Sequence, residues 1–153
     1  MQGGSCRDFL ESVRTICHRM IMNDKLAAEW DQHAGRFARK WRVAMEKKEK
    51  IIHLTDPANL GFRDKIEASM QQNDRVPALK DAHLIEAALL ADGIVVSLEH
   101  ASKRAFARAT GKVEELRSIV WVDPQNNDES PIAWLERGAP PEDHRSLGRA
   151  SRR

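Results

Sequence analysis

The sequence predicts a single α/β domain in which a parallel sheet lies between two layers of helices. Short apolar runs alternate with amphipathic segments, and this alternation is typical of parallel strands joined by helices. The run at residues 94–98 is almost continuously apolar, which favours a strand covered on both faces. With 153 residues, 41% of them hydrophobic, the chain has the size of one domain and enough apolar material for a core.

The first part of the chain predicts a short helix, a strand, a long helix and a second strand. Apolar residues at helical spacing indicate the short helix at residues 9–16, and a brief apolar run follows at residues 19–22. The Asn-Asp pair at residues 23–24 supplies side-chain acceptors that cap a new helix. That helix is expected to continue to Met45, because apolar residues recur at steps of four and seven, and the strand follows at residues 51–54.

The second part predicts two further strands among helices. Helical pieces are expected at residues 62–70, 80–91, 101–109 and 113–116. Residues 71–74 are polar and predict a break between the first two pieces. The strands are expected at residues 94–98, after the helix-ending Gly93, and at residues 119–122.

After Gln125 the composition changes to Asn, Asp, Pro, Gly and Arg, which predicts a tail over residues 125–153. The apolar residues able to dock there are Ile132, Trp134 and Leu135. We therefore expect the tail to be partly docked and then disordered from about Gly138, and the domain itself to span residues 1–124.

Charge and cysteine usage exclude several classes of protein. The 25 Lys and Arg residues nearly balance 23 Asp and Glu residues, so an anionic partner would have to meet a local basic patch. The basic stretch at residues 36–50 could meet phosphates, but a solvated helix face is the better explanation of it. Cys6 and Cys17 show no disulfide or zinc spacing, and no apolar window spans a bilayer, so we expect a cytoplasmic protein with no membrane partner.

Acids near the ends of the predicted elements are the candidates for chemistry. Motifs for a phosphate loop, a dinucleotide, a zinc protease or a serine hydrolase do not occur in the sequence. Glu99 follows the strand at residues 94–98, and ligands of open parallel sheets bind at such strand ends. Asp81 opens the helix that leads into that strand, so the two carboxylates can come together. Glu29, beside the core residue Trp30, is the third candidate.

Carboxylates from separate elements can hold Mg²⁺ or Mn²⁺, because these hard cations prefer oxygen ligands and keep several waters. Each acid also has a purely structural interpretation. Asp81 would cap its helix, and Glu99 would favour the next helix through the helix dipole. Glu29 would pair with Lys25, one turn earlier. The residues alone leave both interpretations open.

Three short motifs resemble the PIN domain family. In that family an acid opens a helix with a mid-helix alanine, and a later strand ends in Thr or Ser, any residue, then Asp. The run DAHLIEAA at residues 81–88 and the run IVVSLE at residues 94–99 are similar to these motifs. Upstream, LAAEW at residues 26–30 looks like the helix that carries the family's glutamate. The resemblance covers about residues 6–124.

The resemblance implies a three-layer α/β/α nuclease fold that depends on Mg²⁺ or Mn²⁺. Glu29, Asp81 and Glu99 would then be the catalytic residues and the metal ligands. The family's members are most often endoribonucleases and frequently toxins of toxin-antitoxin pairs. RNA is therefore the expected partner, and an antitoxin protein and a second copy of the chain are further candidates.

The chain departs from the family pattern at two places. Members of the family begin with a strand that bears the first acid, whereas this sequence starts at the helix of residues 9–16, so we expect an N-terminally truncated domain with an incomplete acidic site. Glu99 replaces the expected Asp, and its extra methylene displaces the carboxylate. The expected function is a PIN-like endoribonuclease; the alternative is an inactive PIN-like module that binds RNA or a protein partner.

Overall fold

The computed structural model describes residues 2–55 and 60–151, except for the side chains of residues 2–5 and 60. The chain divides into two compact units. The first unit consists of Met1–Asp56 and Asp123–Pro140, and the second consists of Pro57–Val122 and Pro141–Arg153. Each unit is therefore assembled from an earlier and a later stretch of the chain, whereas the sequence predicted one domain over residues 1–124 followed by a tail.

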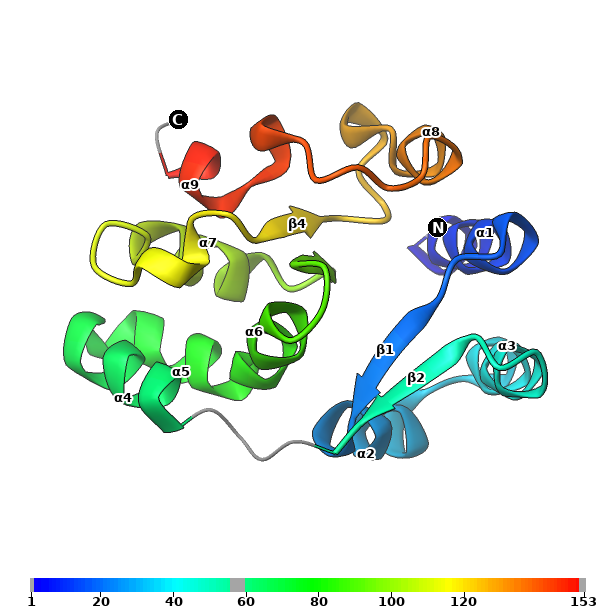
Figure 1. Ribbon diagram of the computed structural model, residues 1–153, viewed down its shortest axis with the longest axis horizontal. Coiled ribbons are helices and arrows are strands. Elements are labelled where there is room, and N and C mark those ends of the chain that lie inside the picture. The colour runs from blue at the N-terminus through cyan, green and yellow to red at the C-terminus, as the bar shows by residue number, and fades with distance from the viewer. Residues whose placement is uncertain (1, 56–59, 152–153) are drawn as a thin grey trace. The chain divides into compact units, whose positions relative to one another are not determined.

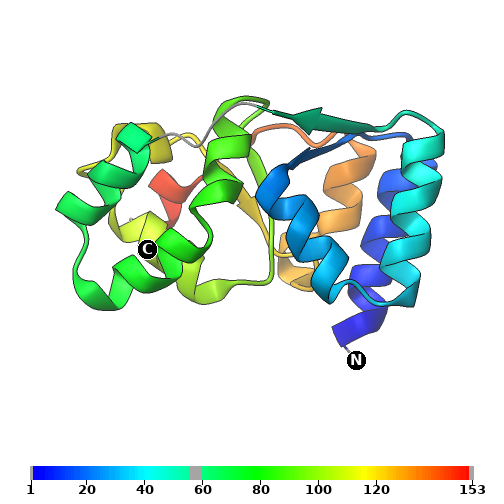
Figure 2. The ribbon, with the colours of Figure 1, turned by 90° about the horizontal axis from the view of Figure 1, so that it is seen from below.

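The first unit contains a parallel strand pair surrounded by helices. Its elements are α1 (Gln2–Ile16), β1 (Met20–Asn23), α2 (Asp24–His33), α3 (Arg36–Lys47), β2 (Ile51–Leu54), the short helix η2 (Asn127–Glu129) and α8 (Pro131–Glu136). β1 and β2 run parallel, with Met20 opposite Ile51 (Figure 1). α8 lies against α1, as both ribbon views show (Figures 1 and 2).

The helix that was expected to run from residue 24 to Met45 is two helices in the structure. Its predicted cap is confirmed, because Asn23 Oδ1 accepts a hydrogen bond from the Leu26 amide at 2.9 Å. Ala34 and Gly35 are extended and separate α2 from α3, and glycine is a poor helix former. The break brings the rings of Trp30 and Trp41 to 5.6 Å between centroids.

The core of the first unit is small. Its buried apolar side chains are Phe9, Val13, Met22, Trp41, Met45, Trp134 and Leu135. The indole N–H of Trp41 donates to the Leu10 carbonyl at 2.6 Å, so the most deeply buried part of α3 is fixed to α1. The indole of Trp134 donates to the Pro140 carbonyl at 2.8 Å. Trp134 and Leu135 of α8 therefore belong to the core.

The second unit contains the other strand pair and more helices. Its elements are α4 (Leu60–Ser69), α5 (Gln72–Lys80), α6 (Ala82–Leu89), β3 (Ile94–Val96), α7 (His100–Arg108), η1 (Glu114–Leu116), β4 (Val120–Val122), η3 (Asp143–Arg145) and α9 (Leu147–Ala150). β3 runs parallel to β4, with Ile94 opposite Val120. An antiparallel bridge joins Val120 to Ser146. α9 packs against α7 (Figure 1).

α5 lies partly where the sequence predicted a polar break. Ala78 is the buried residue of this helix, so α5 has no apolar stripe from which to predict it. Asp81 separates α5 from α6, with the Asp81 amide donating to the Pro77 carbonyl at 3.2 Å. α6 ends before Gly93, which has a φ of +76° and allows the turn into β3.

A large apolar core joins all parts of the second unit. The rings of Phe62 and Phe106 are 6.4 Å apart, and those of Phe106 and Trp121 are 5.9 Å apart. Leu147 on α9 is fully buried in the same cluster. The structure thus differs from the prediction that residues beyond about Gly138 lack structure. The apolar signal there is a single leucine, which is too little to predict docking from sequence.

The α/β class is confirmed, and each predicted apolar run contains a short parallel strand. Within the described residues the strands form two two-stranded sheets, β1–β2 and β3–β4, and not one sheet between two helical layers. Alternation of strands and helices predicts the parallel pairing inside each strand-helix-strand segment, but not how such segments join. In residues 2–55 and 60–151, we found no helix with the length and apolar character to cross a membrane.

Candidate functional site

Asp81 occupies the junction between two helices, and its carboxylate is buried. The residue is 4% exposed, and Ser102 Oγ on α7 donates a hydrogen bond to Asp81 Oδ2 at 2.5 Å. The side chain makes no capping hydrogen bond to α6, which it precedes. The Asp81 side chain therefore does not cap α6, although the structural interpretation of the sequence expected it to. Asp81 instead ties the α5–α6 junction to α7.

Glu99 stands directly before α7, at the position that the sequence predicted as a strand end. Its amide donates to Ser97 Oγ at 3.0 Å, and its carbonyl accepts from the Lys103 amide at 3.1 Å. Its side chain is about half exposed, and Lys80 Nζ lies 3.8 Å from one carboxylate oxygen. Glu99 thus has a fixed backbone and a solvent-accessible carboxylate.

Asp81 and Glu99 are linked through neighbouring residues at the place where α5 ends and α7 begins. Lys80, the last residue of α5, pairs with Glu99, and Ser102, one turn into α7, hydrogen-bonds to Asp81. We call this group of four side chains, Lys80, Asp81, Glu99 and Ser102, the acidic corner. The sequence predicted that the Asp81 and Glu99 carboxylates can come together. In the structure Glu99 pairs with Lys80, which adjoins Asp81, and Asp81 accepts a hydrogen bond from Ser102, three residues after Glu99.

The opposite ends of α5 and α7 are also joined. Arg108 at the end of α7 forms a two-pronged ion pair with Asp74 near the start of α5, at 2.6 and 2.9 Å. The guanidinium of Arg108 lowers the pKa of Asp74 through these hydrogen bonds. The two helices therefore run antiparallel, with the acidic corner at one end and this ion pair at the other.

Glu29, the third predicted ligand, belongs to the first unit. It lies on α2, a helix without any fully buried residue, and its own side chain is half-buried. The predicted acids are thus divided between two units. In the part of the chain that the structure describes, no group of three or more His, Cys, Asp or Glu side chains is arranged to hold a metal ion.

Ser102 and Lys80 are members of the corner that the sequence analysis did not identify. Ser102 is 1% exposed and comes three residues after Glu99, so helical spacing places both near one face of α7. The spacing of Ser102 from Glu99 was the available signal in the sequence. Lys80 precedes Asp81 directly, and its role depends on where α7 begins, which the sequence does not give.

A second buried carboxylate lies farther along α6. Glu86, whose side chain is 8% exposed, accepts two hydrogen bonds from Arg63 on α4, at 2.7 and 3.2 Å. The hydrogen bond to Glu86 raises the pKa of Arg63. The pair joins two helices of the same unit, which is a structural role.

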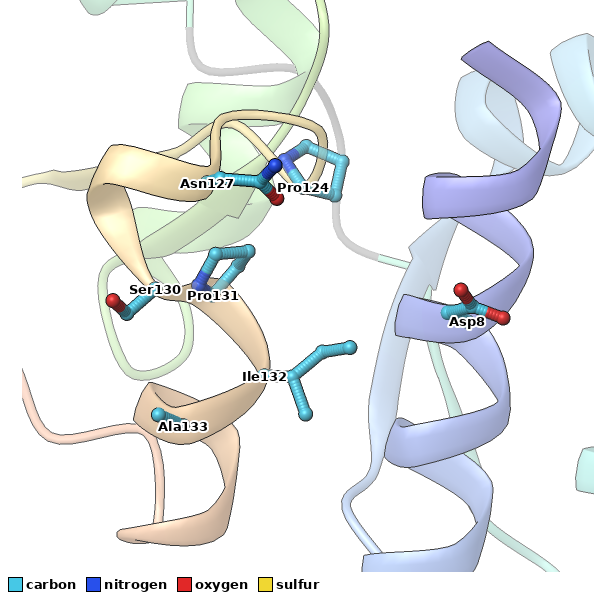
Figure 3. Close-up of a pocket in the computed structure, with 7 residues that line it drawn as sticks. All are labelled: Asp8, Pro124, Asn127, Ser130, Pro131, Ile132 and Ala133. Carbon is cyan, nitrogen blue, oxygen red and sulfur yellow. The ribbon is translucent and has the colours of Figure 1, made fainter. Parts of the chain in front are cut away.

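The first unit has a small hollow of its own between α1 and the segment that contains η2 and α8. Asp8 on α1 is its one carboxylate among the described lining residues, and Ile132 points from α8 toward α1 (Figure 3). The hollow has a volume of about 210 Å³. A single exposed carboxylate beside an apolar side chain does not make a metal site, so we assign no chemistry to this hollow.

Comparisons with known proteins add no assignment to this geometry. No protein-family model, no curated protein and no solved structure matches the chain. The functional argument therefore depends on the acidic corner and on the residues around it.

Proposed function

We propose that the protein is a metal-dependent ribonuclease of the PIN type that cleaves RNA with Asp81 and Glu99 of the acidic corner; Glu29 is a further candidate that depends on the resemblance alone. The observation that supports this proposal is the pair of links at the α5–α7 junction, in which Lys80 pairs with Glu99 and Ser102 hydrogen-bonds to Asp81. The two acids come from the two motifs that resemble the family.

The donor chemistry of the corner fits a hard divalent cation in part. Asp81 offers a carboxylate whose orientation is fixed by Ser102, and Glu99 offers one that reaches solvent. Mg²⁺ and Mn²⁺ are often held by one or two carboxylates, with water and substrate phosphates completing the shell. Such an ion, when bound, activates water and neutralises charge on the phosphoryl group. Glu29 enters the proposal through the resemblance and is tested separately.

The other members of the corner have roles that need no metal. Ser102 positions the Asp81 carboxylate, so it is a positioning residue. Lys80 sits 3.8 Å from Glu99 and holds a positive charge where the RNA backbone would approach. A lysine ammonium is a compact point charge with three rotatable donors, suited to a phosphate oxygen. Lys80 therefore serves to neutralise Glu99 in the free protein and to contact a phosphate in the complex.

The test is Mn²⁺-dependent cleavage of single-stranded RNA by the full chain and its variants. Asp81→Asn is expected to abolish cleavage while the circular dichroism spectrum and the melting temperature stay near those of the unmodified chain, because the amide keeps the shape of the carboxylate. Glu99→Gln and Glu29→Gln are expected to lower the rate by about tenfold to a hundredfold, the usual cost of disturbing a metal site. Glu67→Gln, an exposed acid of α4, is the matched control.

Full activity in Asp81→Asn would remove Asp81 from the site and refute the proposal for the acidic corner. Full activity in Glu29→Gln alone would confine the site to the second unit. A conservative Ser102→Thr variant tests the positioning role: it keeps a hydroxyl beside Asp81 and is expected to retain more activity than Ser102→Ala. Equal losses in both would contradict that role.

A second candidate function is a PIN-like module that binds RNA or a protein partner without cleaving it. Two observations favour it: the described residues contain no group of three metal-binding side chains, and Lys80 already pairs with Glu99. In this case the protein binds RNA in the presence of EDTA, with an affinity that falls steeply as salt rises. Binding that leaves the RNA intact after Mn²⁺ is added would select this function over the first.

A further inference from the structure

The second unit contains a hollow of about 750 Å³ at the end of α7 that is distinct from the acidic corner. It is lined by the C-terminal end of α7, the turn that follows it, the chain after η1, and the segment that contains η3 and α9. Along α7, Arg108 at this end lies six residues beyond Ser102 at the other end, which corresponds to about 9 Å of helix. We call it the arginine hollow.

Positive charge exceeds negative charge in the arginine hollow. Arg108, Arg117 and Arg149 line it, and Asp143 is the one carboxylate among its described lining residues. Arg108 is already paired with Asp74. Neither Arg117 nor Arg149 forms an ion pair with a described residue, so two guanidinium groups are available to an anion.

The walls of the arginine hollow are built by backbone contacts. Arg117 Nε donates to the Thr110 carbonyl at 2.9 Å, which leaves the terminal nitrogens of its guanidinium for a ligand. On the facing side, the Gly148 amide donates to the Arg117 carbonyl at 3.2 Å, and the Leu147 amide donates to the Ile119 carbonyl at 2.9 Å.

Gly148 is needed for this close approach. A Cβ atom at position 148 would lie 2.9 Å from the Arg117 carbonyl oxygen, closer than real Cβ atoms come to a backbone atom. The absence of a side chain at Gly148 therefore lets α9 dock, with Leu147 buried beside it and Arg149 at the rim. The hydrogen bond from the Gly148 amide to the Arg117 carbonyl therefore places Arg117 and Arg149 near one another in the chain's fold.

We propose that the arginine hollow binds a phosphate group, carried by a nucleotide or by an RNA chain. Guanidinium groups bind phosphate through parallel hydrogen bonds, and two of them can share the charge of one phosphate. The described lining residues bear hydroxyl, charged or no side chains, and none is aliphatic or aromatic, so the hollow offers nothing to a lipid tail. The proposal does not depend on nuclease activity, because the arginines lie at the other end of α7.

In the experiment, anionic probes are titrated into the full chain in EDTA. Calorimetry measures their binding affinity, and changes in amide chemical shifts locate the binding site. The probes are pyrophosphate, adenosine monophosphate, a short single-stranded RNA and poly-glutamate. Arg117→Gln/Arg149→Gln is expected to weaken binding of the phosphate probes by about tenfold or more, the effect of losing charge-assisted hydrogen bonds. Arg104→Gln, an exposed arginine on the same helix α7, is the matched control and is expected to bind like the unmodified chain.

The results distinguish a nucleotide from an RNA strand as the source of the phosphate, and both from an acidic protein. Binding of the monophosphate as tightly as RNA assigns the hollow to a nucleotide. Tighter binding of RNA, with a salt slope that falls by about 0.7 in the double variant, assigns it to one phosphate of a strand. Unchanged phosphate binding in the double variant overturns the proposal, and equal binding of poly-glutamate overturns it in favour of an acidic protein. If the double variant does not fold, Arg149→Gln alone is expected to show the same loss in smaller measure, and its absence likewise overturns the proposal.

Discussion

Each of the two units contains a parallel strand pair joined by a helical crossover, but the crossover helices differ in how deeply they are buried. In the second unit the crossover helix α7 buries Ser102, Ala105, Phe106 and Ala107. In the first unit the crossover consists of α2, which buries no residue fully, and α3, which buries Trp41 and Met45. The crossover of the second unit is thus part of its core, whereas half of the first unit's crossover lies on the surface.

This difference decides how firmly the candidate site residues are held. Asp81 is enclosed by α5, α6 and α7 and is hydrogen-bonded to a buried serine. Glu29 is carried by the helix that lacks fully buried residues. Catalytic constellations need supporting packing to hold their geometry within about half an ångström. The comparison teaches that the Asp81 side chain is held firmly by its surroundings and that α2 supplies Glu29 with much less support.

The strongest test of the comparison is to remove packing from each crossover. Phe106→Ala in α7 is expected to lower the free energy of unfolding by about 3–5 kcal/mol, because the ring is fully buried between Phe62 and Trp121. Leu26→Ala in the half-buried α2 is expected to cost about 1 kcal/mol or less. Urea unfolding followed by tryptophan fluorescence measures both. Equal losses would show that the two crossovers are equally integrated.

A smaller effect is expected from the ion pair that joins α4 to α6. Arg63→Met leaves the Glu86 carboxylate in a site that is 8% exposed without its bidentate partner, which is expected to cost about 1–3 kcal/mol. Arg104→Met, at an exposed position of α7, should change stability by less than about 0.5 kcal/mol and controls for the loss of an arginine. If the two variants unfold at the same urea concentration, the Arg63–Glu86 ion pair does not contribute to the stability of the second unit.

The smallest effect concerns the pH dependence of the ion pair at the far end of α5 and α7. Because Arg108 hydrogen-bonds to Asp74, the pKa of Asp74 lies below its ordinary 3.8 in the folded protein. The unfolded state then binds more protons, so the pair stabilises the fold above about pH 4, and this contribution is lost as the pH falls through the folded pKa.

Asp74→Asn is therefore expected to make stability less dependent on pH in the acid range, because the variant loses the contribution of the ion pair at neutral pH and differs least from the unmodified chain at the lowest pH. Equilibrium unfolding at a series of pH values between about 2 and 6 measures this slope. Asp64→Asn, an exposed acid on α4, should leave the slope as it is. A slope for Asp74→Asn that matches the unmodified chain would show that the ion pair does not form in solution.

Much of the local structure could be predicted from sequence because it depends on near neighbours. Apolar runs located each strand of the described residues, and the Asn23 cap was correct down to its hydrogen bond. The break at Ala34 and Gly35 was missed because the apolar spacing on the two sides of it looks like one helix. α5 was missed because it is a polar helix, and its position depends on packing against α7.

The candidate site was predictable to the same degree. Asp81 and Glu99 were identified from motifs near the ends of elements, and the links of Asp81 to Ser102 and of Glu99 to Lys80 lie at the one junction of α5 with α7. Ser102 and the arginine hollow were not identified, because both depend on which segments pack against α7. The hollow needs residues after Gly138, a stretch in which the sequence indicated no structure.

Leu147 gives the molecule a particular order of events during synthesis. This side chain is fully buried in a cluster whose other fully or largely buried members lie between residues 62 and 121. During synthesis, residues 57–122 therefore leave the ribosome before the segment that completes the second unit. The later segment of the first unit, Asp123–Pro140, is also made before α9. Until Leu147 has been synthesised, the apolar side chains that it covers in the second unit stay exposed to solvent. Exposed apolar surface of this kind is what chaperones bind on nascent chains.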